Sequence, residues 1–192
     1  YLAAAHLLDD AQDNGRMLSA NGAVAALGAA NIILVNATVA KGALVDILEA
    51  FGRVTVIGAN AQAAEKKEER LPTRTEYFQS IAGKAAVIIA TGVWAGGRLA
   101  TDNPETLSQL KEFGLAWGMA TQISDDFLDL AEDLADGLYT LPVIEGLSST
   151  EHPHYPLLKQ LVGKTNLDSQ EIETVLTILE DMGAIVACQR LI

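Results

Sequence analysis

An acidic pattern, D-D-x-x-D, occurs twice in this chain, at Asp9-Asp10-Ala11-Gln12-Asp13 and at Asp125-Asp126-Phe127-Leu128-Asp129. Each copy directly follows an apolar segment rich in Ala or Gly, so we expect each to project from a helix whose other faces are buried. Residues three and four positions apart lie on the same face of a helix, so the three carboxylates of each copy should lie together. The repeat therefore predicts two acidic helix faces.

Two partly buried acidic faces favour a bound cation. At a separation of about 6 Å and an effective dielectric constant of about 20, a pair of carboxylates repels by roughly 3 kcal/mol. Oxygen ligands without Cys or His suit Mg²⁺, which typically takes carboxylates, waters and substrate phosphates. The predicted metal ligands are Asp9, Asp10, Asp13, Asp125, Asp126 and Asp129. In a chain with 25 acidic residues, a single copy would more often be a solvated face, and it is the second copy that favours a magnesium-bound phosphoryl ligand.

Composition restricts the class of protein further. With 192 residues, 49% of them hydrophobic, the chain is expected to form one domain over residues 1–192. A net charge of −12 argues against nucleic acid as a partner. The single cysteine, Cys188, excludes a disulfide framework and suggests a small core residue in the cytoplasm.

The uncharged stretch 22–40 raises the question of a membrane span. Because it contains Asn31 and Asn36 and much Ala and Gly, we interpret it as a buried helix of a bundle, not as a transmembrane helix.

Helix start and stop signals recur along the chain, whereas strand signals are nearly absent, so the fold is predicted to be all-α. Asn103 followed by Pro104 predicts the start of the helix that carries the second acidic motif. Asp168-Ser169-Gln170-Glu171 fits a capping box that opens the last helix, which should end near Gly183. Further helices are expected over about 2–14 and 77–95, one or two helices over 21–52, and a solvated helix or a mobile connection over 58–74.

Several of these segments resemble the trans-isoprenyl diphosphate synthase (polyprenyl synthetase) family. Residues 122–130, read as Q-I-S-D-D-F-L-D-L, are similar to that family's Q-I-x-D-D-x-L-D-L. Residues 133–144 resemble its D-L-x-x-G-K-x-T-L-P-x-I, and Lys84-Ala85-Ala86 resembles its K-T-A. The resemblance implies a bundle of mostly antiparallel helices around a central active-site cavity.

The resemblance also implies an activity and roles for individual residues. It implies a Mg²⁺-dependent prenyltransferase that condenses an allylic diphosphate with isopentenyl diphosphate, and a homodimer. The six aspartates and Lys84 would be catalytic, and Arg16, Lys84 and Gln122 would bind diphosphate. In this family, bulky residues at the positions of Ala4 and Ala5 stop chain growth early, so alanine there implies products of twenty carbons or more.

The sequence also departs from the family pattern. Only one Arg, Arg16, follows the first motif, Leu138 occupies the place of a diphosphate-binding lysine, and the segment after Leu130 is shorter than the usual lid. The chain begins at Tyr1, so we interpret it as truncated before the helices that normally bind isopentenyl diphosphate. Three alternatives therefore remain: a non-catalytic or regulatory subunit of a heteromeric synthase, a prenyltransferase that modifies a peptide, and a class I terpene cyclase.

Overall fold

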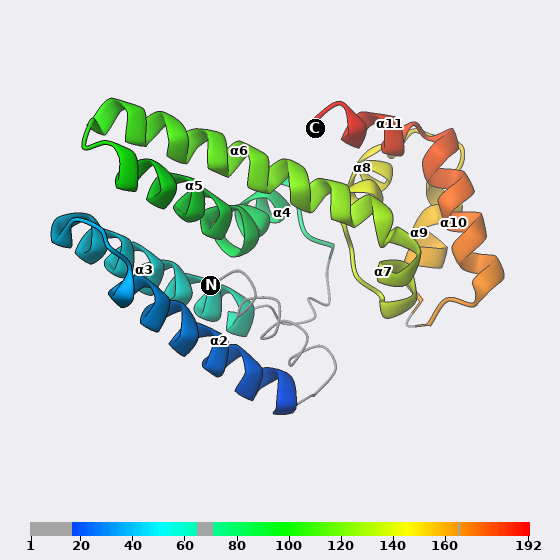
Figure 1. Ribbon diagram of the computed structural model, residues 1–192. Helices are drawn as coiled ribbons and strands as arrows, with labels where there is room; N and C mark the ends of the chain where they lie inside the picture. Colours follow the sequence, from blue (N-terminus) through cyan, green and yellow to red (C-terminus); the bar gives the residue numbers. More distant parts are fainter. Residues whose placement is uncertain (1–16, 65–70, 165) are drawn as a thin grey trace. The chain divides into compact units, whose positions relative to one another are not determined.

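The computed structural model describes residues 17–64, 71–164 and 166–192, and their regular structure is helical without a strand (Figure 1). The all-α prediction is therefore confirmed. The described residues form two compact units. The first contains α2 (Met17–Asn36), α3 (Lys41–Ala64), the π-helical turn η1 (Ala82–Ala86), α5 (Val87–Ala100) and α6 (Pro104–Leu128) as far as Gly118. The second contains α4 (Arg74–Ile81), the remainder of α6, α7 (Leu130–Asp136), α8 (Leu141–Ser148), α9 (Tyr155–Val162), α10 (Ser169–Asp181) and α11 (Ala184–Gln189).

In the first unit, helices α5 and α6 lie side by side (Figure 1). Two buried glycines of α6, Gly114 and Gly118, face the backbone of Ala90 and Ala86 at van der Waals contact. The half-buried Arg98 of α5 joins this pair to α3, because its Nε donates to Asp46 Oδ2 at 2.9 Å. Small residues and one charge-assisted hydrogen bond thus determine how closely these helices approach.

The predicted caps at Asn103 and Asp168 are confirmed. Asn103 Oδ1 accepts hydrogen bonds from the amides of Glu105 at 2.9 Å and Thr106 at 3.2 Å, and α6 begins at Pro104. Asp168 Oδ1 accepts from the Glu171 amide at 2.9 Å, while the Glu171 side chain accepts from the Asp168 amide at 3.2 Å. This reciprocal pair satisfies two amides that have no partner inside α10.

Some helix boundaries differ from the prediction. One or two helices were expected over residues 21–52, and two form, of which α2 ends at Asn36; α3, however, runs past Gly52 to Ala64. The helix expected to stop at Ala95 continues to Ala100. The helix continues through Gly97. A Cβ atom at this position would lie 2.3 Å from Leu110 Cδ1, so this glycine allows a close approach of α6 and does not end the helix.

The expectation that α2 is a buried helix is wrong. Its apolar residues Val24, Ile32 and Ile33 are 68%, 64% and 69% exposed, and Ala23 is its one fully buried side chain among those described. The apolar residues of α2 are distributed over all of its faces. A helix of this kind that packs on one side leaves apolar surface exposed on the other.

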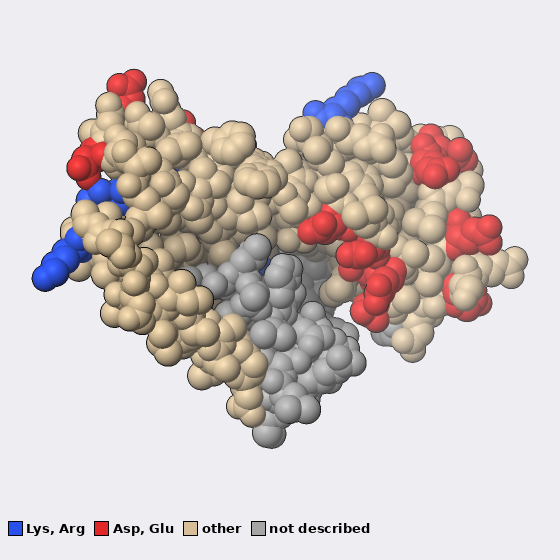
Figure 2. All heavy atoms as spheres, in the orientation of Figure 1, with Lys and Arg blue, Asp and Glu red and all other residues tan. Residues whose placement is uncertain are grey.

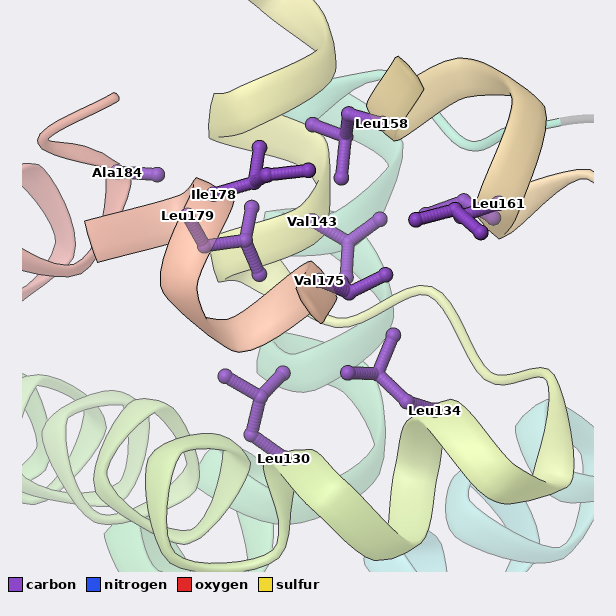
Figure 3. Close-up of a cluster of buried hydrophobic side chains, with 10 residues drawn as sticks. Leu130, Leu134, Val143, Leu158, Leu161, Val175, Ile178, Leu179 and Ala184 are labelled. Carbon is purple, nitrogen blue, oxygen red and sulfur yellow. The ribbon is translucent and has the colours of Figure 1, made fainter. Parts of the chain in front are cut away.

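The second unit has two clusters of buried side chains. The larger packs helices α7 to α10 and the start of α11 together (Figure 3), through Leu130, Leu134, Val143, Leu158, Leu161, Val162, Val175, Ile178, Leu179 and Ala184. The smaller joins α4, α6, α8 and α11 through Tyr77, Ile81, Ile123, Leu141, Ile144 and Cys188. Cys188 is fully buried, as predicted for a core residue, and burial raises the pKa of its thiol to about 12.

By length and composition, one helical stretch among the described residues, Arg74–Ala100, is long and apolar enough to cross a membrane. A core helix of a water-soluble protein satisfies the same criterion.

Candidate active site

The second acidic motif lies at the junction of α6 and α7. Asp125 and Asp126 belong to the last turn of α6, which ends at Leu128, and Asp129 precedes α7 with φ −101° and ψ 5°. Asp129 continues the turn, because its amide donates to the Asp125 carbonyl at 2.9 Å and its carbonyl accepts from the Asp133 amide at 2.8 Å. Asp125 and Asp129 are exposed, whereas Asp126 is only 5% exposed. The expectation that all three carboxylates share one face is therefore wrong for Asp126.

Asp126 is held by hydrogen bonds from three helices of the second unit. The Tyr77 hydroxyl of α4 donates to Asp126 Oδ2 at 2.5 Å, and the Leu141 amide of α8 donates to the same oxygen at 3.4 Å. Gln122, one turn earlier in α6, donates to Oδ1 at 3.2 Å. Both carboxylate oxygens thus have donors inside the protein, as a buried polar group requires.

Burial changes the ionisation of this pair. It raises the pKa of Asp126, although the hydrogen bonds from Tyr77, Gln122 and Leu141 oppose that rise. The pKa of Tyr77 is also raised, first by burial and then by its hydrogen bond to Asp126. Tyr77 therefore stays protonated and acts as the donor.

Acidic side chains continue from this junction along α7. Figure 2 shows them gathered over the end of α6 and over α7. The exposed members are Asp125, Asp129, Glu132 and Asp136. Asp133 is half-buried among them, and burial, followed by the charges of Asp126 and Asp129, raises its pKa to about 7. Such a surface repels an anion unless a cation neutralises it.

The donor chemistry at this junction fits a hard divalent cation, because Asp125 and Asp129 present exposed carboxylate oxygens. However, within residues 17–64, 71–164 and 166–192 no group of three or more His, Cys, Asp or Glu side chains is arranged to hold a metal ion. The metal-ligand set therefore stays a prediction. It includes Asp9, Asp10 and Asp13, which lie outside the described residues.

Of the other predicted site residues, the structure describes Lys84 and Gln122 and leaves three undescribed. Lys84 is half-buried in the π-helical turn η1, a kind of turn that often occurs at functional sites. Gln122 donates to Asp126 at 3.2 Å, and its contact with diphosphate stays a prediction. Leu138, at the position where the family has a lysine, is 45% exposed after the left-handed Gly137. Ala4, Ala5 and Arg16 lie outside the described residues.

Sequence reasoning missed two residues of this site. Tyr77 lies 49 positions before Asp126, and no local pattern connects them. Asp133 lies in the segment 133–144 that resembles the family pattern, but no role was predicted for it. Its position one helical turn after Asp129 is the signal that could have identified it.

One or two carboxylates together with substrate phosphates are a usual ligand set for Mg²⁺. The family model for polyprenyl synthetase matches residues 12–179, and the chain belongs to this family. The recognition from the sequence is thus confirmed.

Similar proteins include curated enzymes and solved structures. A short chain isoprenyl diphosphate synthase of Methanocaldococcus jannaschii is 27% identical over 147 residues, which cover 70% of this chain and 45% of that protein. A geranylgeranyl diphosphate synthase of Saccharolobus solfataricus is 28% identical over 124 residues, covering 58% of this chain and 37% of that protein. The chain thus spans less than half the length of these curated relatives.

Solved structures show the same fold. The crystal structure of geranylgeranyl pyrophosphate synthetase from Pyrococcus horikoshii matches with a TM-score of 0.81 at 22% identity, covering 98% of this chain and 65% of that one.

Proposed function

We propose that this protein is a magnesium-dependent trans-prenyltransferase that condenses an allylic diphosphate with isopentenyl diphosphate to a polyprenyl diphosphate of twenty carbons or more. The observation that carries the proposal is the exposed pair Asp125 and Asp129 at the junction of α6 and α7, in a chain matched by the polyprenyl synthetase model over residues 12–179. The relatives include geranylgeranyl diphosphate synthases, and this similarity supports the proposed substrate class and product length.

In the proposed reaction, Asp125 and Asp129 would hold Mg²⁺ together with the first motif, Asp9, Asp10 and Asp13. Magnesium would neutralise the charge that develops on the departing diphosphate. Lys84 and Arg16 would add donors to the diphosphate oxygens, because charge-assisted hydrogen bonds strengthen as that charge grows. Ala4 and Ala5 would leave room for the growing chain. We propose that residues 1–192 form a single helical domain.

The test is an incubation of the protein with Mg²⁺, labelled isopentenyl diphosphate and each allylic primer in turn, with EDTA and the Asp125→Ala variant as controls. We expect a labelled product that depends on both magnesium and Asp125. Binding of primer without condensation would contradict the proposed reaction and favour a non-catalytic subunit of a heteromeric synthase. A cyclised hydrocarbon would favour a terpene cyclase, and transfer to a peptide would favour a peptide-modifying prenyltransferase.

We further propose that the protein is a cytoplasmic homodimer without a transmembrane helix. The exposed apolar residues of α2, among them Val24, Ile32 and Ile33, support the homodimer, because homodimer interfaces are more apolar than the rest of a protein surface. Sedimentation velocity of the protein and of its Ile33→Lys variant tests it. We expect a dimer that the lysine shifts toward monomer, and a concentration-independent monomer for both would contradict it.

A further inference from the structure

The second acidic motif contains one carboxylate that is buried and hydrogen-bonded inside the protein. Asp126 is 5% exposed, and Tyr77, whose hydroxyl is its closest partner, is 7% exposed. Gln122 donates to the other oxygen, so neither oxygen of Asp126 lacks a donor. Three donors occupy most of the roughly four lone-pair sites of this carboxylate, and at 5% exposure the remaining site has little access to a hydrated cation.

The same hydrogen bonds hold the turn that presents the other two carboxylates. Ile123 and Leu130, which flank Asp126 on the inner side of this turn, are 2% and 4% exposed. Asp125 and Asp129 lie on the outer side. Asp129 receives no capping hydrogen bond to its own side chain from α7, so the orientation of its carboxylate depends on the backbone of the turn.

We propose that Asp126 is a positioning residue, held by the Tyr77 hydroxyl, and that only Asp125 and Asp129 of the second motif contact the metal-bound diphosphate. This inference rests on the proposed function, because it assigns different roles to the aspartates of that site. If all three aspartates had the same role, replacing any one of them should have the same effect on metal binding. Binding measurements can therefore distinguish the two cases.

The probe is Mn²⁺ in the presence of inorganic pyrophosphate, followed by electron paramagnetic resonance to count the bound ions per chain and to measure their affinity. Thermal melting in EDTA reports on the fold of each variant. The variants are Tyr77→Phe, Asp126→Asn, their combination and Asp125→Asn. The matched control is Tyr139→Phe, which also removes a tyrosine hydroxyl that donates inside the second unit, in this case to the Val162 carbonyl at 2.9 Å.

We expect Asp125→Asn to lose a bound Mn²⁺. Tyr77→Phe and Asp126→Asn should keep the same number of ions as the parent, with an affinity about tenfold lower, the usual effect of losing a group that supports a metal ligand. The double variant should be no weaker than Asp126→Asn within about twofold, because the two residues form one hydrogen bond and their effects are not additive. Tyr139→Phe should keep the parental affinity even if it melts at a lower temperature.

Three results would overturn the inference. If Asp126→Asn lost a Mn²⁺ ion as Asp125→Asn does, while melting like the parent, Asp126 would be a ligand. Equal Mn²⁺ affinities for Tyr77→Phe and Tyr139→Phe would show that the Tyr77 hydroxyl contributes to stability alone. A parent protein that bound pyrophosphate equally with and without Mn²⁺ would refute the proposed function itself, and the inference with it.

Discussion

The Cα atom of Ala86 in η1 lies 2.6 Å from the position that a Cβ atom on Gly118 of α6 would take. Gly114, about one turn earlier, has the same relationship to Ala90 of α5, again at 2.6 Å. In both cases the nearest atom belongs to the backbone, which cannot rotate away as a side chain can. The lack of a side chain at these two positions therefore sets the distance between the helices.

We expect Gly118→Ala to lower the free energy of unfolding by about 1–2 kcal/mol. Overpacking against backbone outweighs the better helix propensity of alanine, which is worth up to about 1 kcal/mol. Gly96→Ala is the matched control, because Gly96 is exposed in α5 and a Cβ atom there meets nothing within 4 Å. The control should gain stability in urea denaturation. A gain in both variants would show that the helices separate without cost.

The raised pKa of Asp133, about 7, predicts a pH dependence of stability in EDTA. In the unfolded chain this carboxyl loses its proton near pH 4, whereas in the folded protein it keeps the proton up to about pH 7. The folded state thus binds more protons between these values, and the free energy of unfolding falls as pH rises from about 4 to 7. Above that range both states are ionised, and the penalty stays constant.

Asp133→Asn should remove this penalty. Because Asp133 is only half-buried and solvent screens its charge, we expect a gain on the order of 1 kcal/mol at pH 8 that disappears near pH 4. Glu173→Gln, an exposed change of the same charge in α10, controls for net charge. Melting curves at several pH values measure the effect. Equal gains for both variants at every pH would contradict the role of burial at Asp133.

Asp9→Ala and Asp125→Ala should each abolish turnover while the metal-free protein keeps its stability. Removing a carboxylate relieves repulsion that only a bound cation would otherwise neutralise, so the variants should melt in EDTA at or above the parental temperature. Calorimetry should show that pyrophosphate binds strongly to the parent only with Mg²⁺. Variants that melted well below the parent in EDTA would indicate a structural role for these aspartates.

Leu138→Lys should increase the affinity for an allylic diphosphate. The side chain is 45% exposed, so a lysine fits there, and a charge-assisted contact is worth about 1.5–3 kcal/mol. Isothermal titration with a non-reactive allylic analogue in Mg²⁺ measures the change. The same affinity in both proteins would show that this position does not face the diphosphate.

Ala5→Phe and Ala4→Phe should shorten the product without a change in primer affinity. A phenyl ring fills space that at least one further five-carbon unit would need. Chromatography of the dephosphorylated products checks this outcome. A fifteen-carbon product from the parent, or an unchanged product from both variants, would mean that other residues limit chain length.

Local signals in the sequence predicted local structure well. The starts of α6 and α10 follow from Asn103 and Asp168, because capping involves residues within one turn of each other. The end predicted at residue 95 is wrong because the contact that explains Gly97, with Leu110, exists only once α5 and α6 pack together.

The candidate site was predictable in its chemistry but not in its geometry. The spacing of Asp125, Asp126 and Asp129 places them on neighbouring turns of a helix, but it does not say which side faces the core. That is decided by Tyr77 and Leu141, which come from two other helices and approach Asp126 only in the folded chain. A helical period describes one helix, whereas burial depends on its neighbours.

Helix N-termini commonly bind phosphate, because their first amides have no acceptor within the helix. In α8 these amides are already engaged. The Leu141 amide donates to Asp126, Pro142 has no N–H, and the amides of Val143 and Ile144 donate to the Thr140 carbonyl at 3.1 Å. The backbone of residues 141–144 therefore leaves no amide free for a diphosphate oxygen, so an anion recognised nearby must rely on other donors, such as side-chain cations, or on bound metal.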